Sequence, residues 1–141
     1  MRNIFLSSDH TGGLLVEKIA DFLTLSGFNP IILVLQEGED YTDAAKKVST
    51  KVLEMPGSMG IVVCGSGIGV SIACNRFKGV RAALCHSPEV AKLSRLHNDA
   101  NVLCLGARML EASLQLDMVK LFLNTGFEGG RHAVRINKID N

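Results

Sequence analysis

Short apolar runs alternate with longer amphipathic stretches along the chain. The apolar runs consist almost entirely of Val, Ile, Leu, Ala and Cys, which is typical of parallel strands covered on both faces. They predict five strands, at residues 4–8, 30–35, 60–64, 80–84 and 102–105. The stretches between them place apolar residues at helical spacing and predict helices at residues 11–25, 43–53, 68–75, 88–97 and 110–123.

This alternation predicts an α/β fold, a doubly wound five-stranded parallel sheet in a three-layer α/β/α arrangement. Right-handed crossovers would bring the loops that follow the strands to one edge of the sheet. We expect residues 1–141 to form a single domain, because one domain commonly has this length. Residues 131–139 predict a short basic helix or arm, and we expect the C-terminal arm, about residues 127–141, to pack on a partner subunit.

Charge and hydropathy narrow the classes of partner. The formal net charge is +1 and no basic stripe is present, so we expect no nucleic-acid binding. No apolar run reaches the length of about 18 residues that a membrane helix needs, so we expect no membrane partner. The first apolar run is too short for a secretory signal and the four cysteines lack CxxC spacing. We therefore expect a cytoplasmic protein with reduced thiols.

A glycine-rich loop joins the third predicted strand to a helix, with the sequence Cys64-Gly65-Ser66-Gly67-Ile68-Gly69. Alternating glycines let backbone N–H groups point into one concavity, where they can hold a phosphate or a developing oxyanion. The alternative is a tight turn that needs glycine for steric reasons alone. A thiolate at Cys64 could act there as a base or a nucleophile. The alternative for a cysteine is a buried small side chain, which is our expectation for Cys74, Cys85 and Cys104.

Several known loop types do not fit this segment. A Walker loop requires a lysine that is missing here, and the dinucleotide fingerprint has a different glycine spacing and follows a first strand. A cysteine-phosphatase loop would carry an arginine where this chain has Val70. The remaining interpretation of the loop is anion stabilisation.

Two further polar clusters are candidates for chemistry. Asp9 and His10 follow the first predicted strand and should share an edge of the sheet with Cys64, although Asp9 could simply cap the next helix. His97 and Asn98 precede the fifth strand and should therefore lie at the opposite edge. They can reach Cys64 only if the loop folds back or a neighbouring subunit supplies them, and a surface histidine is the alternative.

Basic residues form a last group, Arg108, Arg131 and Arg135. Arg131 and Arg135 are four residues apart on the predicted arm helix, so both could bind one anion. A solvated basic face is the alternative.

Taken together, the motifs resemble the ribose-5-phosphate isomerase B family, which includes the galactose-6-phosphate isomerase subunits. The resemblance covers nearly the whole chain, and the motifs that carry it lie at residues 8–12, 40–43, 64–69, 73–76, 79–82, 93–101, 106–108 and 128–132. It implies a Rossmann-like fold, no cofactor, no metal, and a homodimer, possibly a dimer of dimers, with composite active sites. It also implies aldose–ketose interconversion of a phosphorylated sugar through a cis-enediolate.

The resemblance implies roles for individual residues. Cys64 would move the proton between C2 and C1 of the sugar, while Ser66 and His97 would open the ring. The other implied residues bind the substrate. Backbone amides would stabilise the enediolate at Gly65, Gly67, Ile68 and Gly69. Sugar contacts would come from Asp9, Asn98 and Tyr41, and phosphate contacts from His10, Arg108, Arg131 and Arg135, partly from the partner subunit.

The sequence favours an isomerase of D-ribose 5-phosphate and D-ribulose 5-phosphate in the pentose phosphate pathway. Gly13 and Thr42 depart from the usual family residues beside the sugar site, so a six-carbon substrate, allose-6-phosphate or galactose-6-phosphate, stays open. The rival from another class is a non-catalytic sugar-phosphate-binding module. Cys64 together with His97 speaks against that rival, because binding alone requires neither.

Overall fold

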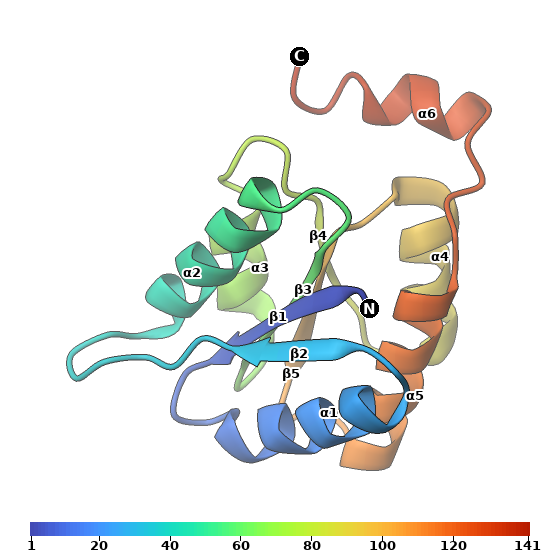
Figure 1. Cartoon of the computed structure of the whole chain (residues 1–141). Helices are drawn as coiled ribbons and strands as arrows, with labels where there is room; N and C mark the ends of the chain where they lie inside the picture. The colour runs from blue at the N-terminus through green and yellow to red at the C-terminus, as the bar shows by residue number, and fades with distance from the viewer.

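Five apolar segments form one parallel sheet in the computed structural model, which describes residues 1–141 (Figure 1). The strands are β1 (Asn3–Ser8), β2 (Asn29–Ile32), β3 (Met59–Cys64), β4 (Ala82–Leu84) and β5 (Val102–Gly106). Their order across the sheet is β2-β1-β3-β5-β4, and every neighbouring pair is parallel. The predicted α/β class and the five-stranded parallel sheet are confirmed.

Helices cover both faces of the sheet. One layer contains α1 (Gly13–Leu25), α4 (Pro88–Asn98) and α5 (Ala112–Asn124), and the other contains α2 (Tyr41–Glu54) and α3 (Ile68–Cys74). A sixth helix, α6 (Arg131–Ile136), follows the sheet domain and has no buried residue. In Figure 1, α6 lies outside the three layers, close to the C-terminus of the chain. It contacts α4.

The two layers produce two apolar cores. Along β3, Ile61 and Val63 pack with one core while Val62 and Cys64 pack with the other. All six residues of β3 are buried. Burial on both faces explains why the strand is a continuous apolar run rather than an alternating one.

The position of the functional loops follows from the winding. The chain leaves β1 toward the α1 layer and leaves β3 toward the α3 layer, although β1 and β3 are neighbours in the sheet. The two loops therefore separate at the carboxyl ends of these strands. A crevice at such a point is where doubly wound sheets usually bind ligands.

Several predicted element ends were wrong. β2 ends at Ile32 rather than at residue 35: β1 runs on to Ser8, but the Leu33 carbonyl accepts from the Ser7 hydroxyl at 2.6 Å instead of from a backbone amide. β4 begins at Ala82 rather than at residue 80. α2 begins earlier than predicted because Asp40 caps it: its carboxylate accepts from the Thr42 amide at 2.8 Å, and the Asp43 carboxylate accepts from the Asp40 amide at 2.9 Å.

The remaining differences are shifts of one residue at the ends of β1, β3 and β5 and small shifts at helix ends. α1 and α5 begin at Gly13 and Ala112, and α6 ends at Ile136, each within a few residues of the prediction. Leu14, an apolar residue near the start of α1, is 68% exposed. It lies on the solvent side of the first turn, whereas its neighbours Leu15 and Val16 are buried in the core.

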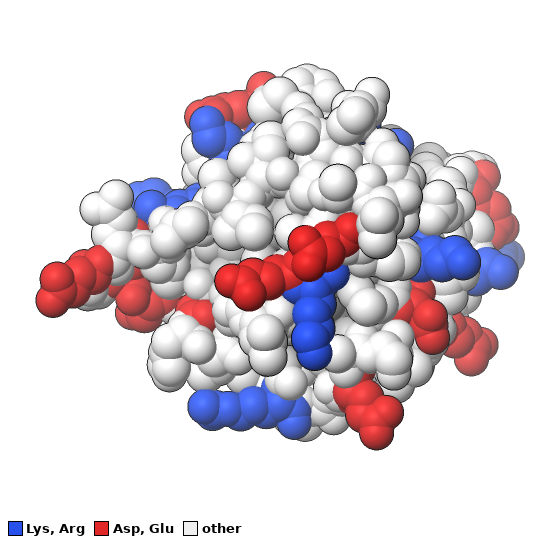
Figure 2. Space-filling view, turned by 60° about the horizontal axis from the view of Figure 1, so that its bottom comes forward, with Lys and Arg blue, Asp and Glu red and all other residues white.

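One face of the molecule carries no dominant charge. Figure 2 shows Lys and Arg interspersed with Asp and Glu on one face, without a patch of a single sign. None of the helices has both the length and the apolar composition that a membrane-spanning helix requires.

Candidate functional site

A hollow of about 550 Å³ opens where the loops after β1, β3 and β5 meet. This volume lies within the range of roughly 300–1,000 Å³ that is common for small-molecule sites. Most of the predicted site residues line it: Asp9, His10, Tyr41, Cys64, Gly65, Ser66, Gly69 and Arg108. Thr11 and Met109 complete the lining. The prediction that Asp9, His10 and Cys64 share one edge of the sheet is confirmed.

Cys64 ends β3 at the mouth of the glycine-rich loop. Its side chain is largely buried, and the Gly67 amide donates a hydrogen bond to its Sγ at 3.2 Å. The Ile68 amide donates to Ser66 Oγ at 3.1 Å across Gly67, the N-cap of α3. The amides of Gly65 and Ser66 donate no hydrogen bond within the protein. Two free amides therefore stand beside a sulfur held in place, which suits the binding of an oxyanion.

Glycine is required at two places in this loop for different reasons. Gly67 has φ +80°, and a Cβ there would lie 2.6 Å from Leu84 Cδ1 and 2.9 Å from the Leu105 carbonyl carbon. A Cβ at Gly69 would lie 2.5 Å from Cε1 of Tyr41. Gly67 lets the loop press against β5, and Gly69 lets the Tyr41 ring lie on the start of α3. The steric interpretation of the glycines is thus correct, and it also shapes the anion-binding loop.

The turn after β5 is fastened to the same loop. The Ala107 amide donates to the Cys64 carbonyl at 2.8 Å, and the Arg108 amide donates to the Gly65 carbonyl at 3.1 Å. From below, buried Gln115 donates through Nε2 to the carbonyls of Gly106 at 3.3 Å and Leu110 at 3.0 Å. These bonds hold both ends of the turn that carries Arg108 over the hollow.

Asp9 is also fixed locally. Its Oδ1 accepts from the Thr11 amide at 3.0 Å and from the Thr11 hydroxyl, which is the turn geometry of an aspartate before a helix. Asp9 remains part of the lining of the hollow. The capping interpretation is wrong, because Gly12 is the N-cap of α1 and no side chain caps that helix; Asp9 instead fixes the turn before it.

The other three cysteines are buried in the core, as predicted. Burial raises the pKa of the Cys85 thiol to about 11. The neighbouring Cys74 thiol, together with burial, raises the pKa of Cys104 well above its ordinary value. Cys64 is the cysteine that lines the hollow.

A second group of predicted residues lies away from Cys64. His97, Asn98, Arg131 and Arg135 are absent from the lining of the hollow and sit at the end of α4 and on α6. Because α4 returns from the carboxyl edge to the start of β5, its last turn lies at the amino edge of the sheet. The topological expectation for His97 is confirmed.

The end of α4 is held by a buried arginine. Asp99 ends the helix with φ 45° in the left-handed region, and its Oδ1 accepts from Arg95 at 2.9 Å. Arg95 also donates to the carbonyls of Ala100 at 2.6 Å and Thr125 at 3.1 Å. Arg95 thereby ties the turn that carries His97 and Asn98 to the segment that leads into the arm.

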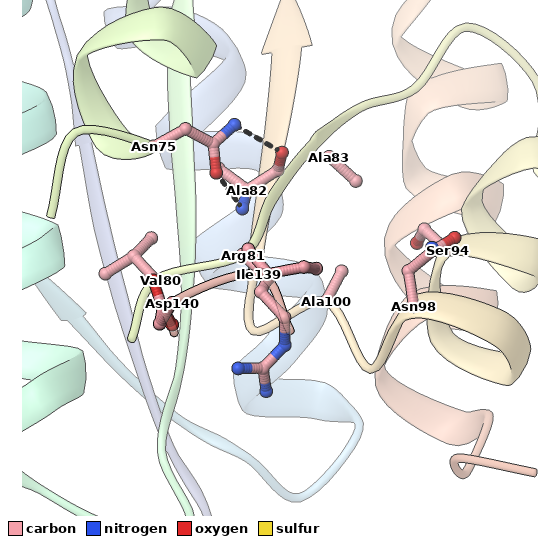
Figure 3. Close-up of a pocket in the computed structure, with 10 residues that line it drawn as sticks. All are labelled: Asn75, Val80, Arg81, Ala82, Ala83, Ser94, Asn98, Ala100, Ile139 and Asp140. Carbon is pink, nitrogen blue, oxygen red and sulfur yellow. Dashed lines mark hydrogen bonds between the residues drawn. The ribbon is translucent and has the colours of Figure 1, made fainter. Parts of the chain in front are cut away.

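Asn98 lines a different cavity, of about 380 Å³, between β4, α4 and the C-terminal segment. Figure 3 shows Ser94 and Asn98 on α4 across from Asn75, with Ile139 and Asp140 of the C-terminal segment nearby. The Gly79 amide donates to Asp140 at 3.0 Å, so the end of the arm is fastened at the amino edge. Within one chain, Asn98 therefore cannot share a ligand with Cys64.

His97, Glu128 and His132 are the titratable cluster nearest to a metal-ligand arrangement, with ligand atoms within 4.8 Å of one another. The two imidazole rings are stacked, however, with centroids 4.4 Å apart and an interplanar angle of 13°. Lone pairs of parallel rings point side by side rather than toward one point. The geometry therefore does not favour a shared metal ion.

Sequence reasoning missed several residues that build these regions: Arg95, Gln115, Glu128 and His132. Arg95 and Gln115 are charged or polar residues in amphipathic helices, and no local pattern marks them as buried. Glu128 and His132 are four residues apart, which was a usable sign that their side chains interact.

Comparisons with known proteins agree with this geometry. The family model described as Ribose/Galactose Isomerase matches residues 4–139. A curated relative from Mycoplasma genitalium, named a probable ribose-5-phosphate isomerase B, is 44% identical over 97% of this chain and 93% of its own.

Two solved structures are as similar to this chain in sequence as that relative is, at 44% identity. Ribose-5-phosphate isomerase B of Clostridium thermocellum has a TM-score of 0.94 at 44% identity, covering 98% of this chain and 95% of that chain. Ribose-5-phosphate isomerase B of Mycoplasma genitalium with bound ribulose-5-phosphate has a TM-score of 0.91 at 44% identity, covering 97% and 93%. The resemblance drawn from the motifs is confirmed, and the chain belongs to the ribose/galactose isomerase family.

Proposed function

We propose that this protein interconverts D-ribose 5-phosphate and D-ribulose 5-phosphate, with Cys64 as the base. The observation that carries the proposal is the placement of the Cys64 sulfur beside the free amides of Gly65 and Ser66 in one hollow. A similar chain with ribulose-5-phosphate bound supports the substrate class. The reaction belongs to the pentose phosphate pathway, and we expect it to take place in the cytoplasm.

The chemistry follows from these positions. The Cys64 thiolate takes the proton from C2 of the open-chain aldose, and the C–H electron pair forms the C1–C2 double bond while negative charge develops on O1. Loop amides from Gly65 to Gly69 hold that charge as it forms. Cys64 then returns the proton to C1, the carbonyl forms at C2, and the hydroxyl proton moves from O2 to O1, so no atom is gained or lost. One base serves both carbons because they are adjacent.

The hollow also offers groups for the rest of the sugar. Asp9 and Tyr41 line it beside Cys64 and would contact the hydroxyls, and His10 and Arg108 would bind the phosphate. Ser66 would assist ring opening from the loop itself. Binding energy from the phosphate then orients C1 and C2 against the sulfur.

The remaining residues require a second copy of the chain. His97, Asn98, Arg131 and Arg135 lie at the amino edge, away from the Cys64 hollow. We propose a homodimer in which these residues enter the partner's hollow, with His97 opening the ring, Asn98 binding a hydroxyl and the arginines binding phosphate. A two-fold axis beside the edge strand β4 reverses the strand direction, so the amino edge of one chain would meet the carboxyl edge of the other.

An exposed apolar face lies where that axis would pass. Ile68 and Ile72 are 53% and 55% exposed on one side of α3, and Leu84 ends the edge strand nearby. Leu93 on α4 and Met109 beside the hollow extend the exposed apolar surface. A dimer that covered this face would bury the apolar residues and the open edge of β4 together. Two such dimers could pair further.

A coupled assay of the purified protein with ribose 5-phosphate and allose-6-phosphate, side by side, tests the proposal. We expect turnover of ribose 5-phosphate with the higher kcat/KM. Higher kcat/KM for allose-6-phosphate would assign a six-carbon substrate, and turnover of neither sugar phosphate would contradict the isomerase proposal in favour of a binding module.

A further inference from the structure

His97 has two close neighbours that have no part in the mechanism described so far. Its imidazole lies flat against that of His132, with ring centroids 4.4 Å apart. Its Nε2 lies 3.8 Å from Oε2 of Glu128. The His97 side chain is 42% exposed, so without these neighbours little would restrict its orientation.

Glu128 faces both rings at once. Its other oxygen, Oε1, lies 3.9 Å from Nε2 of His132. The Glu128 amide donates to the Leu96 carbonyl at 3.0 Å, which fastens this residue to the last turn of α4 beside His97. One carboxylate therefore lies within ion-pair distance of Nε2 of both stacked histidines, although its side chain is 55% exposed.

His132 provides a largely buried aromatic surface for this stacking. Its side chain is 12% exposed, and its Nε2 is buried without a hydrogen-bond partner. Burial, with smaller effects of His97, Arg131 and Arg135, lowers the pKa of His132, although Glu128 opposes this. A neutral ring can stack on His97 in either protonation state without placing two positive charges together.

We propose that Glu128 and His132 are positioning residues for His97 in sugar ring opening. This inference rests on the proposed function, in which His97 acts on the furanose form of the substrate. Stacking on His132 fixes the plane of the His97 ring, and the Glu128 carboxylate favours the tautomer with its proton on Nε2. That leaves the Nδ1 lone pair free to act as the base.

The proton balance of the step is complete. Nδ1 of His97 takes the proton from the anomeric hydroxyl, the O–H electron pair forms the C1=O bond, and the bond from C1 to the ring oxygen breaks. The imidazolium then gives its proton to that oxygen. Glu128 stabilises the imidazolium while it exists, as a carboxylate does behind a catalytic histidine.

The test compares a substrate that needs ring opening with one that does not. 4-Deoxyribose 5-phosphate lacks the hydroxyl that closes the furanose ring, so it stays open-chain. We expect Glu128→Gln to lower kcat/KM for ribose 5-phosphate about tenfold or more, and for the analogue by less than about twofold. His132→Ala should behave like Glu128→Gln, and His132→Phe, which keeps a flat ring, should regain most of the activity on ribose 5-phosphate.

The deuterium isotope effect at C2 supplies a second readout. When ring opening becomes slow, proton transfer no longer limits the rate, so the effect with [2-²H]ribose 5-phosphate should fall toward one in Glu128→Gln. Glu89→Gln, an exposed change at the other end of α4, is the matched control and should leave both substrates and the isotope effect unchanged.

Outcomes that overturn the inference are distinct from those that overturn the function. Equal losses on both substrates, with an unchanged isotope effect, would show a general structural effect and contradict the positioning role. Failure of His132→Phe to exceed His132→Ala would contradict the stacking argument. Absence of turnover by the unsubstituted protein would overturn the proposed function, and the positioning role with it.

Discussion

The carboxyl edge and the amino edge of the sheet both present polar side chains, but they hold them by different means. At the carboxyl edge, Cys64 and the glycine-rich loop are pressed against β5 and fastened by backbone hydrogen bonds. At the amino edge, Arg131 and Arg135 stand on a short exposed helix, and His97 is held by neighbouring side chains. The first region is built into the core, while the second is attached to it.

This difference indicates a division of labour. Proton transfer to carbon tolerates little misplacement, and its base belongs to the rigid region. In the proposed dimer, phosphate binding and ring opening come from groups that reach across to another chain, and these lie on the arm and at the end of α4. Substitutions in the two regions should therefore fail differently, the first in proton transfer or stability and the second in substrate affinity or ring opening.

Cys64→Ala should produce the largest loss. Removal of a general base commonly costs up to about 10⁴-fold in rate, and we expect a fall in kcat/KM of that order in the coupled assay. The fold should persist, because alanine fits where the buried thiol was. Cys85→Ala is the control, since the raised pKa of Cys85 leaves it protonated and it lies outside the hollow. Wild-type turnover by Cys64→Ala would show that Cys64 is not the base.

Arg135→Ala should raise KM while the stability of the fold is kept. A hydrogen bond to a charged group contributes about 1.5–3 kcal/mol, which corresponds to roughly a 10–100-fold higher KM for ribose 5-phosphate. The thermal unfolding midpoint should not change, because Arg135 is exposed. Lys138→Ala removes another exposed cation of the arm and should leave KM unaltered. An unchanged KM in Arg135→Ala would exclude it from the phosphate site.

Gly67→Ala should show the rigidity of the carboxyl edge directly. Both the positive φ and the contact of 2.9 Å with the Leu105 carbonyl carbon oppose a Cβ, so we expect a loss of about 2–4 kcal/mol in unfolding free energy. Gly27 has φ +86° with open space around it, and Gly27→Ala should cost about 1–2 kcal/mol. Denaturant unfolding measures both. Equal losses of unfolding free energy in the two variants would mean that the close packing of Gly67 on β5 does not contribute to the cost of its substitution.

The sequence predicted the rigid region better than the attached one, for a physical reason. The parallel strands and the loops at the carboxyl edge follow from apolar runs and crossover handedness, so Asp9, His10 and Cys64 could be placed together, although the strand order was not predicted. Strand ends depend on neighbours, and the edge strands β2 and β4 are accordingly shorter than their apolar runs.

The attached region depends on contacts between distant segments. The stacking of His97 on His132 and the tie from Arg95 to the Thr125 carbonyl join residues about 30 positions apart, which no local period reveals. Even so, topology alone placed His97 at the edge away from Cys64. The sequence could thus indicate that the site is divided, although not how the second half is held.

Mixing two inactive variants tests the divided site most directly. Cys64→Ala and His97→Ala chains, carrying different tags, are unfolded and refolded together so that dimers form at random. If each site combines Cys64 of one chain with His97 of the other, hybrid dimers contain one intact site, and the mixture should recover about one quarter of the unsubstituted activity. A mixture no more active than its two parents would contradict the account.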